Sequence, residues 1–332
     1  MKTKCRVGII GAGRMACFHL DVLLKMNDVE VVALANQWSE ERRNAVCRKY
    51  NIPRNYSSFL EMLDQEALDA VFICVSVMDN FTVARSCLVR GIPSLIEKPP
   101  GLSVEETEEL LQIAEFKGVI HMVGLQRRFS STVMEGIRMI RQRSPLMSLV
   151  VEAPERFEEI KAKKKFPQEV LRRWIFNNGI HCLDMLSFLG GHIKEFHVMQ
   201  QTWKEPLHPD CLHALIRFEQ GAIGHYLSNW NSPGNWAVRL FGDGWRLDIE
   251  PMEEGRVTFS DGTQQALPIS QEDRDFKPGL FAQNRMFIDA CLDKKKIGFP
   301  GATLREALVS MQLAECLLSG ALPCRAEGGV VK

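Results

Sequence analysis

The feature that most constrains the fold is a glycine-rich turn close to the N-terminus. Cys5–Ile10 is a short apolar run, the pattern of a buried strand, and an amphipathic stretch typical of a helix reaches from the turn to about Met26. Between them stand Gly11, Ala12, Gly13, Arg14, Met15 and Ala16. In the order strand, G-x-G-x-x-A and helix, the first glycine allows a tight turn and the second lets the main chain approach a pyrophosphate. The alanine lets the helix pack close to the strand. The turn therefore predicts a dinucleotide-binding site at Gly11, Gly13 and the residues that begin the helix.

The end of the second predicted strand bears on which dinucleotide binds. This strand begins at Val29, at the distance that a dinucleotide-binding unit requires, and an acidic residue normally follows it to bind the adenosine ribose. The chain has Asn36 and Gln37 there instead. Asn36 can still hydrogen-bond a 2′-hydroxyl, but it does not repel a 2′-phosphate. Three arginines could reach such a phosphate: Arg14, Arg42 and Arg43. The expected cofactor is therefore NAD or NADP.

Strands and helices alternate through the first third of the chain. Further predicted strands are Ala70–Val75, Ser94–Glu97 and Ile120–Val123, and predicted helices are Ser39–Tyr50, Asp79–Arg90 and Ser103–Lys117. Alternation of this kind is typical of an α/β fold, a doubly wound parallel sheet in which ligands lie beyond the carboxyl ends of the strands. We expect residues 1–125 to form such a Rossmann domain. Glu97 and Lys98 stand at the carboxyl end of one strand, so they should face the same crevice as the glycine turn.

Beyond about residue 145, short strand-like runs separated by turn signals replace the alternation. The runs are Met147–Glu152, Glu195–Thr202, His213–Phe218, Ala222–Asn229, Ala237–Phe241, Arg246–Glu250 and Arg256–Phe259. They predict an α+β domain with a mainly antiparallel sheet over residues 126–320, followed by a tail, 321–332. The helical stretches Gly179–Leu189 and Phe281–Leu292 should flank that sheet, and Thr303–Leu318 should form a closing helix. A sheet of this kind that is open on one side would leave a broad, partly apolar face, and such a face is normally covered by a second copy of the chain, which predicts a homodimer or homotetramer.

Composition excludes several classes of partner. In 332 residues, 41 basic side chains balance 41 acidic ones, so no net charge draws the protein to nucleic acid or to an anionic membrane. The ten cysteines form no C-x-x-C pair and stand singly in apolar surroundings, which is typical of reduced, buried thiols in a cytoplasmic protein. No apolar stretch is long enough to span a membrane. The histidines show no metal-ligand spacing, so no metal is expected.

Five motifs, taken in order, make the chain resemble the Gfo/Idh/MocA oxidoreductases over about residues 5–320. The motifs are Gly11–Ala16, Glu97-Lys98-Pro99, Gly124–Phe129, Asn177–Asp184, and the strand-turn Ser228-Asn229-Trp230 with Pro233. The resemblance implies a Rossmann domain and a C-terminal open-faced domain. It also implies hydride transfer between NAD(P) and a secondary alcohol or ketone of a sugar, a cyclitol or a sugar derivative.

The same resemblance implies roles for individual residues. The lysine of the E-K-P motif contacts the reacting hydroxyl and also lies at the cofactor, and this position is Lys98. The proton-transferring histidine follows an aspartate by four residues, and these positions are His181 and Asn177. The replacement of the aspartate by Asn177 removes a charged partner from His181, although Asp184 or an amide oxygen could substitute.

Three arginines are candidates for substrate binding. Arg172 and Arg173 stand where the family usually has glycines before the histidine motif. They are either ordinary surface charges or groups that recognise a carboxylate, a phosphate or a diphosphate. Arg127, in the third motif, is the other candidate.

The chemistry of a lysine and a histidine fits alcohol oxidation. An imidazole can take the hydroxyl proton near neutral pH while hydride leaves the carbon, and an ammonium group stabilises the developing alkoxide. The leading hypothesis is an NAD(P)-dependent dehydrogenase or reductase that acts on CH–OH groups. Two alternatives remain: a glycosidase of the same fold that retains its NAD, and a non-catalytic dinucleotide-binding sensor. Asn177 is the reason for keeping the glycosidase, and the changes at Asn36, Asn177 and Leu171–Arg173 are the reason for keeping the sensor.

Overall fold

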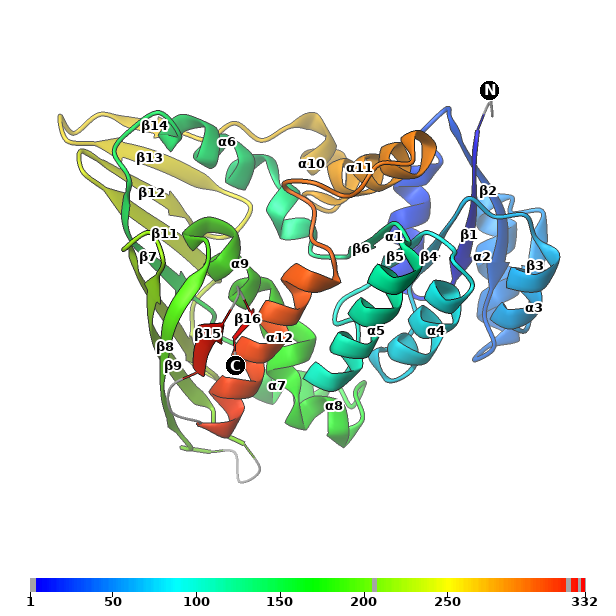
Figure 1. Ribbon diagram of the computed structural model, residues 1–332, viewed down its shortest axis with the longest axis horizontal. Coiled ribbons are helices and arrows are strands. Elements are labelled where there is room, and N and C mark those ends of the chain that lie inside the picture. The colour runs from blue at the N-terminus through cyan, green and yellow to red at the C-terminus, as the bar shows by residue number, and fades with distance from the viewer. Residues whose placement is uncertain (1–3, 205–207, 321–323, 328–329, 332) are drawn as a thin grey trace. The chain divides into compact units, whose positions relative to one another are not determined.

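The computed structural model describes residues 4–204, 208–320, 324–327 and 330–331, and the chain forms two compact units (Figure 1). The first unit contains Met1–Phe129 and Glu272–Ala307, and the second contains Ser130–Gln271 and Leu308–Lys332. The chain thus leaves the first unit close to the expected boundary at residue 125. It then returns to that unit at Glu272, which the sequence analysis did not anticipate.

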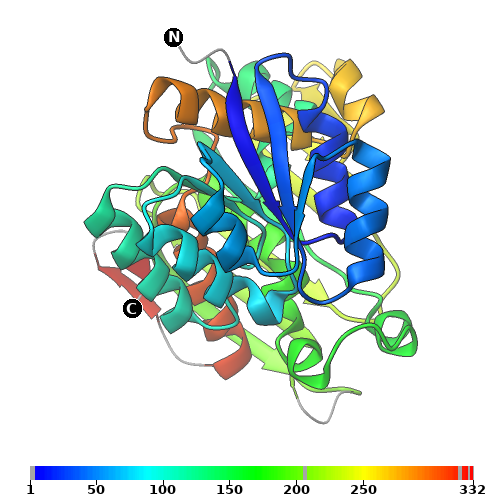
Figure 2. The same ribbon diagram turned by 90° about the vertical axis from the view of Figure 1, so that its right-hand side faces the viewer.

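The first unit is built on a six-stranded sheet with the order β3-β2-β1-β4-β5-β6, in which all neighbouring strands are parallel. The strands are β1 (Cys5–Ile10), β2 (Val29–Ala35), β3 (Arg54–Tyr56), β4 (Ala70–Ile73), β5 (Ser94–Ile96) and β6 (His121–Val123). The helices include α1 (Arg14–Leu23), α2 (Glu40–Tyr50), α3 (Phe59–Gln65), α4 (Val77–Val89), α5 (Val104–Lys117), α10 (Gln271–Asp275) and α11 (Leu280–Asp293). Helices α1, α2 and α11 cover one face, and α3, α4 and α5 cover the other (Figure 2). The predicted Rossmann fold is confirmed.

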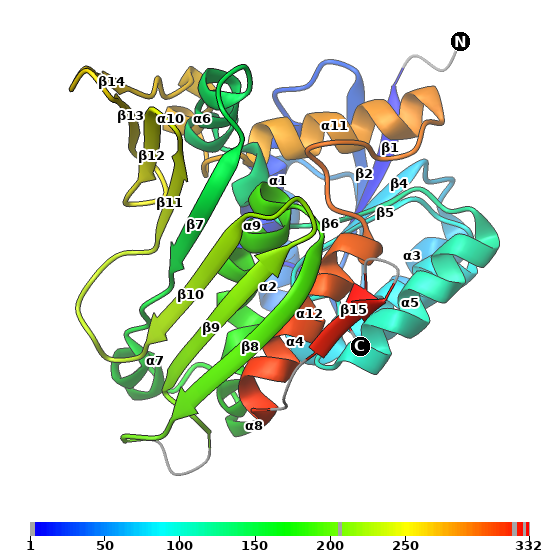
Figure 3. The same ribbon diagram turned by 60° about the vertical axis from the view of Figure 1, so that its left-hand side comes forward.

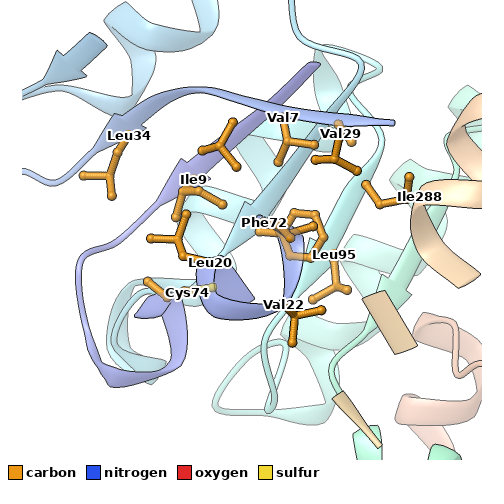
Figure 4. Packing of buried hydrophobic residues seen from close by; sticks show 14 of the residues in the cluster. Val7, Ile9, Leu20, Val22, Val29, Leu34, Phe72, Cys74, Leu95 and Ile288 are labelled. Atoms are coloured by element: carbon orange, nitrogen blue, oxygen red, sulfur yellow. The ribbon is translucent and has the colours of Figure 1, made fainter. Parts of the chain in front are cut away.

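The core on the first face corrects one prediction. Val7, Ile9 and Phe72 of the strands pack with Leu20 of α1 and Ile288 of α11 (Figure 4). The predicted helix Phe281–Leu292 was expected to flank the antiparallel sheet, and this prediction is wrong, because α11 packs on the parallel sheet instead. The periodicity of apolar residues identifies the buried face of a helix, but it does not tell which sheet covers that face.

The second unit is built on a mainly antiparallel sheet with the order β14-β13-β12-β11-β7-β10-β9-β8-β15-β16. The strands are β7 (Leu146–Glu152), β8 (Ile193–Gln201), β9 (Cys211–Phe218), β10 (Ile223–Asn229), β11 (Ala237–Gly242), β12 (Trp245–Ile249), β13 (Gly255–Phe259), β14 (Gln264–Ala266), β15 (Cys324–Glu327) and β16 (Val330–Val331). Only β7 and β10 pair in parallel among the described neighbours. The helices are α6 (Ser131–Ile140), α7 (Phe157–Ala162), α8 (Gln168–Arg172), α9 (Ile180–Gly190) and most of α12 (Leu304–Ser319).

One face of this sheet is open within the chain, as predicted (Figure 3). Helix α9 packs against β7 and β10, and α6 packs against β12 and β13. Buried and exposed residues alternate along β8, β9 and β10, which is the pattern of a sheet covered on one side. Apolar side chains on the uncovered side include Met199, 78% exposed, and Leu215, 48% exposed.

Two general expectations can be compared with the described residues. Eight cysteines are free, as predicted: Cys5, Cys17, Cys47, Cys74, Cys87, Cys182, Cys211 and Cys291. Cys316 is disulfide-bonded, so the expectation of reduced cysteines does not hold there. None of the helices in the described part of the chain has the length and apolar character needed to cross a membrane.

Candidate cofactor and catalytic site

The glycine turn after β1 provides a space of the right kind for a pyrophosphate. Gly11 has φ of +110°, and a Cβ atom there would lie 2.3 Å from the main-chain oxygen of Cys74, so the fold itself requires glycine. Gly13 is different, because its φ of −83° suits any residue and a Cβ there would meet no atom within 4 Å. Gly13 also caps α1 without a side-chain hydrogen bond. The amides that begin α1 therefore lie beside open space, which fits a dinucleotide phosphate.

The residues that begin α1 have distinct roles in this turn. Ala16 is fully buried within the core on the first face of the sheet, consistent with the predicted need for close helix packing. Arg14 is exposed and Met15 is half-buried. Main-chain groups and side chains of this first helical turn are thus available from the side that Gly13 leaves open.

The adenosine end of the predicted site is organised around Asn36, which is 5% exposed. Its Nδ2 donates to the main-chain oxygen of Ser39 at 2.8 Å, and its own main-chain oxygen accepts from Nη1 of Arg43 at 3.0 Å. Gln37 and Arg42 are exposed. Asn36 and Arg43 therefore hold the loop between β2 and α2, and the end of β2 carries amides in place of a carboxylate. This arrangement is compatible with NAD and with NADP.

Lys98 follows β5 at the same carboxyl edge of the sheet as the glycine turn, and its side chain is half-buried. Asn80, in the first half of α4, fixes the main chain on both sides of it. The Asn80 Nδ2 donates to the main-chain oxygen of Glu97 and, at 2.6 Å, to that of Pro99. Asn80 is 2% exposed, so these bonds are shielded from water. Sequence reasoning missed Asn80, because a single asparagine in a helix carries no signal of a contact made elsewhere in the fold.

Glu97 lies in a buried polar cluster behind Lys98. The ring of His19 connects two side chains, with Nε2 at 3.1 Å from Glu97 Oε1 and Nδ1 at 3.0 Å from Asn284 Oδ1. Burial by itself would raise the pKa of Glu97, but the hydrogen bond from His19 and the positive charges of His19, Lys277 and Lys98 hold it below its ordinary value of 4.5. Glu97 was predicted to bind cofactor. That role stays a prediction; the structure places the ionised carboxylate in contact with the core, next to the lysine.

The predicted histidine and its neighbours lie in the second unit on one continuous helical stretch. Asn177 belongs to a π-helix, Ile175–Gly179, and His181 is the second residue of α9, which continues from it. Short π-helices occur frequently at functional sites, because they redirect side chains within a helix. His181 is 4% exposed, and its ring lies 6.2 Å from that of Trp236.

A buried carboxylate anchors this π-helix. Glu155, 6% exposed, accepts from Nε1 of Trp174 at 3.1 Å and from Nδ2 of Asn178 at 2.9 Å. These bonds attach the residues on either side of Asn177 to the segment that follows β7. Glu155 was another residue that the sequence analysis did not single out.

The three candidate arginines have different surroundings. Arg172 is exposed, whereas Arg173 pairs with Glu315 of α12 at 3.6 Å and lies over the ring of Phe176, 5.2 Å from its centre. Arg127 is half-buried in a 3-10 helix, Gln126–Phe129, of the first unit. The surroundings of Arg173 favour a structural role for it.

Two family models match the chain. Residues 5–125 match the model described as an oxidoreductase family with an NAD-binding Rossmann fold. Residues 158–248 match the model of the GFO/IDH/MocA C-terminal domain.

Individual relatives and solved structures agree with these matches. The chain is 27% identical to trans-1,2-dihydrobenzene-1,2-diol dehydrogenase of Mus musculus, over 93% of this chain and 95% of the relative. It is 24% identical to 4-carboxy-2-hydroxymuconate-6-semialdehyde dehydrogenase of a Sphingobium strain, over 69% and 73% of the two chains. A solved structure of levoglucosan dehydrogenase in complex with NADH has a similar fold, with a TM-score of 0.81 and 16% identity over 96% of this chain and 97% of that one.

Proposed function

Because the chain belongs to the Gfo/Idh/MocA family of NAD(P)-dependent oxidoreductases, we propose that it transfers a hydride between the nicotinamide and a secondary alcohol or ketone of a sugar, a cyclitol or a related compound. The observation that carries this proposal is the placement of Lys98. It stands at the sheet edge that holds the phosphate turn, with its main chain held on both sides by Asn80.

The nicotinamide, when bound, supplies or accepts the hydride. Residues of the chain bind the substrate oxygen and transfer its proton. The ammonium group of Lys98 donates a hydrogen bond to the substrate oxygen and stabilises the negative charge that develops there. His181 takes the hydroxyl proton in oxidation and returns it in reduction. Asn177 offers His181 a neutral amide in place of a carboxylate, so the pH dependence of turnover should differ from that of an enzyme with the aspartate.

Cyclic compounds with hydroxyl groups are the first candidates to test as substrates. One relative is named for a dihydrodiol and one structural neighbour for levoglucosan, which supports testing cyclic diols, anhydrosugars, sugars and cyclitols. Arg172 is exposed three residues before the first residue of the π-helix and is proposed to select for an acidic group, so sugar acids and sugar phosphates belong in the screen. Arg127 is proposed as a second substrate contact.

The test compares Lys98→Met and His181→Asn with the wild type on the best substrate of the screen. Both variants should lower turnover on the order of a hundredfold or more, while the affinity for NAD(H) or NADP(H) stays nearly unchanged. Lys117→Met is the matched control, because Lys117 is an exposed lysine at the end of α5. Full activity in both variants would refute the proposed roles.

The substitution Asn177→Asp tests the proposed proton transfer separately. A carboxylate beside an imidazole stabilises its protonated form, so the pH dependence of turnover should shift upward. A protein that binds the nucleotide but converts no compound in the screen would instead support the sensor hypothesis.

A further inference from the structure

A second lysine lies next to the phosphate turn, although it is distant in the sequence. Lys277 is in the segment between α10 and α11, and its Nζ is 3.7 Å from Sδ of Met15. Met15 is the second residue of α1 and follows Gly13, the helix cap that leaves open space, by two positions. The ammonium group is therefore close to the first turn of the helix whose amides face the predicted pyrophosphate.

The segment that carries Lys277 is held by its own hydrogen bonds and ring contacts. The main-chain N–H of Gly279 donates to Oδ1 of Asp273 at 2.7 Å, and that of Leu280 donates to the main-chain oxygen of Lys277 at 3.0 Å. The rings of Phe276 and Phe281, which flank the turn, stack with centres 5.9 Å apart. A lysine on a turn fixed in this way presents its charge from a defined position.

A cation at this edge of the sheet would offset the negative charges of a carboxylate and of a bound dinucleotide. The buried carboxylate of Glu97 is ionised, and Lys277 and Lys98 are the two lysines whose charges lower its pKa. A dinucleotide brings two further negative charges to the glycine turn, close to that carboxylate. Glu97 alone would repel the phosphates, and a lysine that contacts Met15, with a charge that also acts on Glu97, offsets this repulsion.

We propose that Lys277 binds the pyrophosphate of the dinucleotide, as a charged contact that supplements the amides of α1. A lysine binds phosphate as a point charge, which suits a group that meets the cofactor from the edge of the turn. The inference rests on the proposed function, because it assumes that a dinucleotide occupies the turn. It assigns part of the cofactor site to a segment that returns to the first unit only after strands β7 to β14 of the antiparallel sheet.

The test measures the binding of NADH, NADPH and ADP-ribose by calorimetry at two ionic strengths. ADP-ribose contains the pyrophosphate but no nicotinamide. Lys277→Met should lower the affinity for ADP-ribose, and equally that for the dinucleotide that the wild type prefers, by about tenfold or more. This is the typical effect of losing one charge-assisted hydrogen bond. The affinity of Lys277→Met for these nucleotides should also fall less steeply with added salt than that of the wild type. Lys277→Arg, which keeps the charge, should recover most of the lost affinity.

The control is Lys295→Met, which removes the same charge from an exposed position of the same unit. If the wild type binds no nicotinamide nucleotide, the proposed function itself fails. If the wild type binds and Lys277→Met binds equally well, only the inference about Lys277 is wrong. If Lys277→Met raises the KM for the substrate without changing the affinity for ADP-ribose, Lys277 acts at the substrate. This outcome also overturns the inference.

Discussion

The substitution Gly13→Val should separate the stability of the phosphate turn from its capacity to bind a nucleotide. Gly13 has φ of −83° and ψ of −176°, which valine adopts readily, and a Cβ atom there meets nothing within 4 Å. Replacing a glycine reduces the entropy of the unfolded chain, which stabilises the folded protein by about 0.4–1 kcal/mol. Valine is a poorer helix cap than glycine, by about 1 kcal/mol. These opposite effects nearly cancel, so the free energy of unfolding should change by less than about 1 kcal/mol.

The effect on binding should be much larger. The isopropyl group would occupy the open space that the pyrophosphate needs in order to reach the amides of α1. Loss of two charge-assisted hydrogen bonds, each of about 1.5–3 kcal/mol, raises Kd at least about a hundredfold. Calorimetric titration with NAD(H), NADP(H) and ADP-ribose measures this change, and thermal unfolding measures the stability.

Two other glycines of the first unit provide matched controls. Gly298 also has open space at its Cβ position and lies outside the left-handed region, so Gly298→Val should change neither stability nor binding. Gly11→Ala would place a Cβ 2.3 Å from the main-chain oxygen of Cys74 at a φ of +110°, so it should destabilise the fold by more than about 3 kcal/mol. The reasoning is refuted if folded Gly13→Val binds nucleotide as tightly as the wild type, or if it unfolds as readily as Gly11→Ala.

Three further predictions concern the lysine loop, the buried carboxylate and the open sheet. Asn80→Ala removes both hydrogen bonds around Lys98, so kcat should fall about tenfold or more while the Kd for the cofactor is unchanged. A loss confined to thermal stability would contradict this positioning role. Because the folded state lowers the pKa of Glu97, this group stabilises the protein above pH 4.5, and the contribution is lost as the pH falls below that value. Glu97→Gln should therefore flatten the acid side of a plot of unfolding midpoint against pH, and an unchanged slope would rule out this linkage. The open face should pair with a second copy of the chain, so light scattering at micromolar concentration should show a dimer or tetramer, and Met199→Glu should shift the protein towards the monomer. A monomeric wild type would contradict the assembly prediction.

The sequence was informative wherever the cause of a structure is local. A buried strand, two glycines and a helix within about twenty residues predict a phosphate turn, because the positive φ of Gly11 is a property of that single residue. Alternation of strands and helices likewise predicted the parallel sheet, and short strand-like runs separated by turn signals predicted the mainly antiparallel sheet. These patterns repeat over a few residues, so a single sequence contains them.

Other features were decided only when distant segments met. The pattern of α11 shows that one of its faces is apolar, but only the packing of Ile288 with the parallel sheet shows where that face is buried. The contacts of Asn80 with the lysine loop, of His19 with Glu97, and of Lys277 with Met15 join residues that are far apart in the chain. A hydrogen bond of this kind leaves no periodic trace in the sequence, because each partner is a single polar residue whose neighbours would look the same without it. The phosphate turn could thus be recognised from the sequence, whereas the side chains that surround and orient it depend on tertiary contacts.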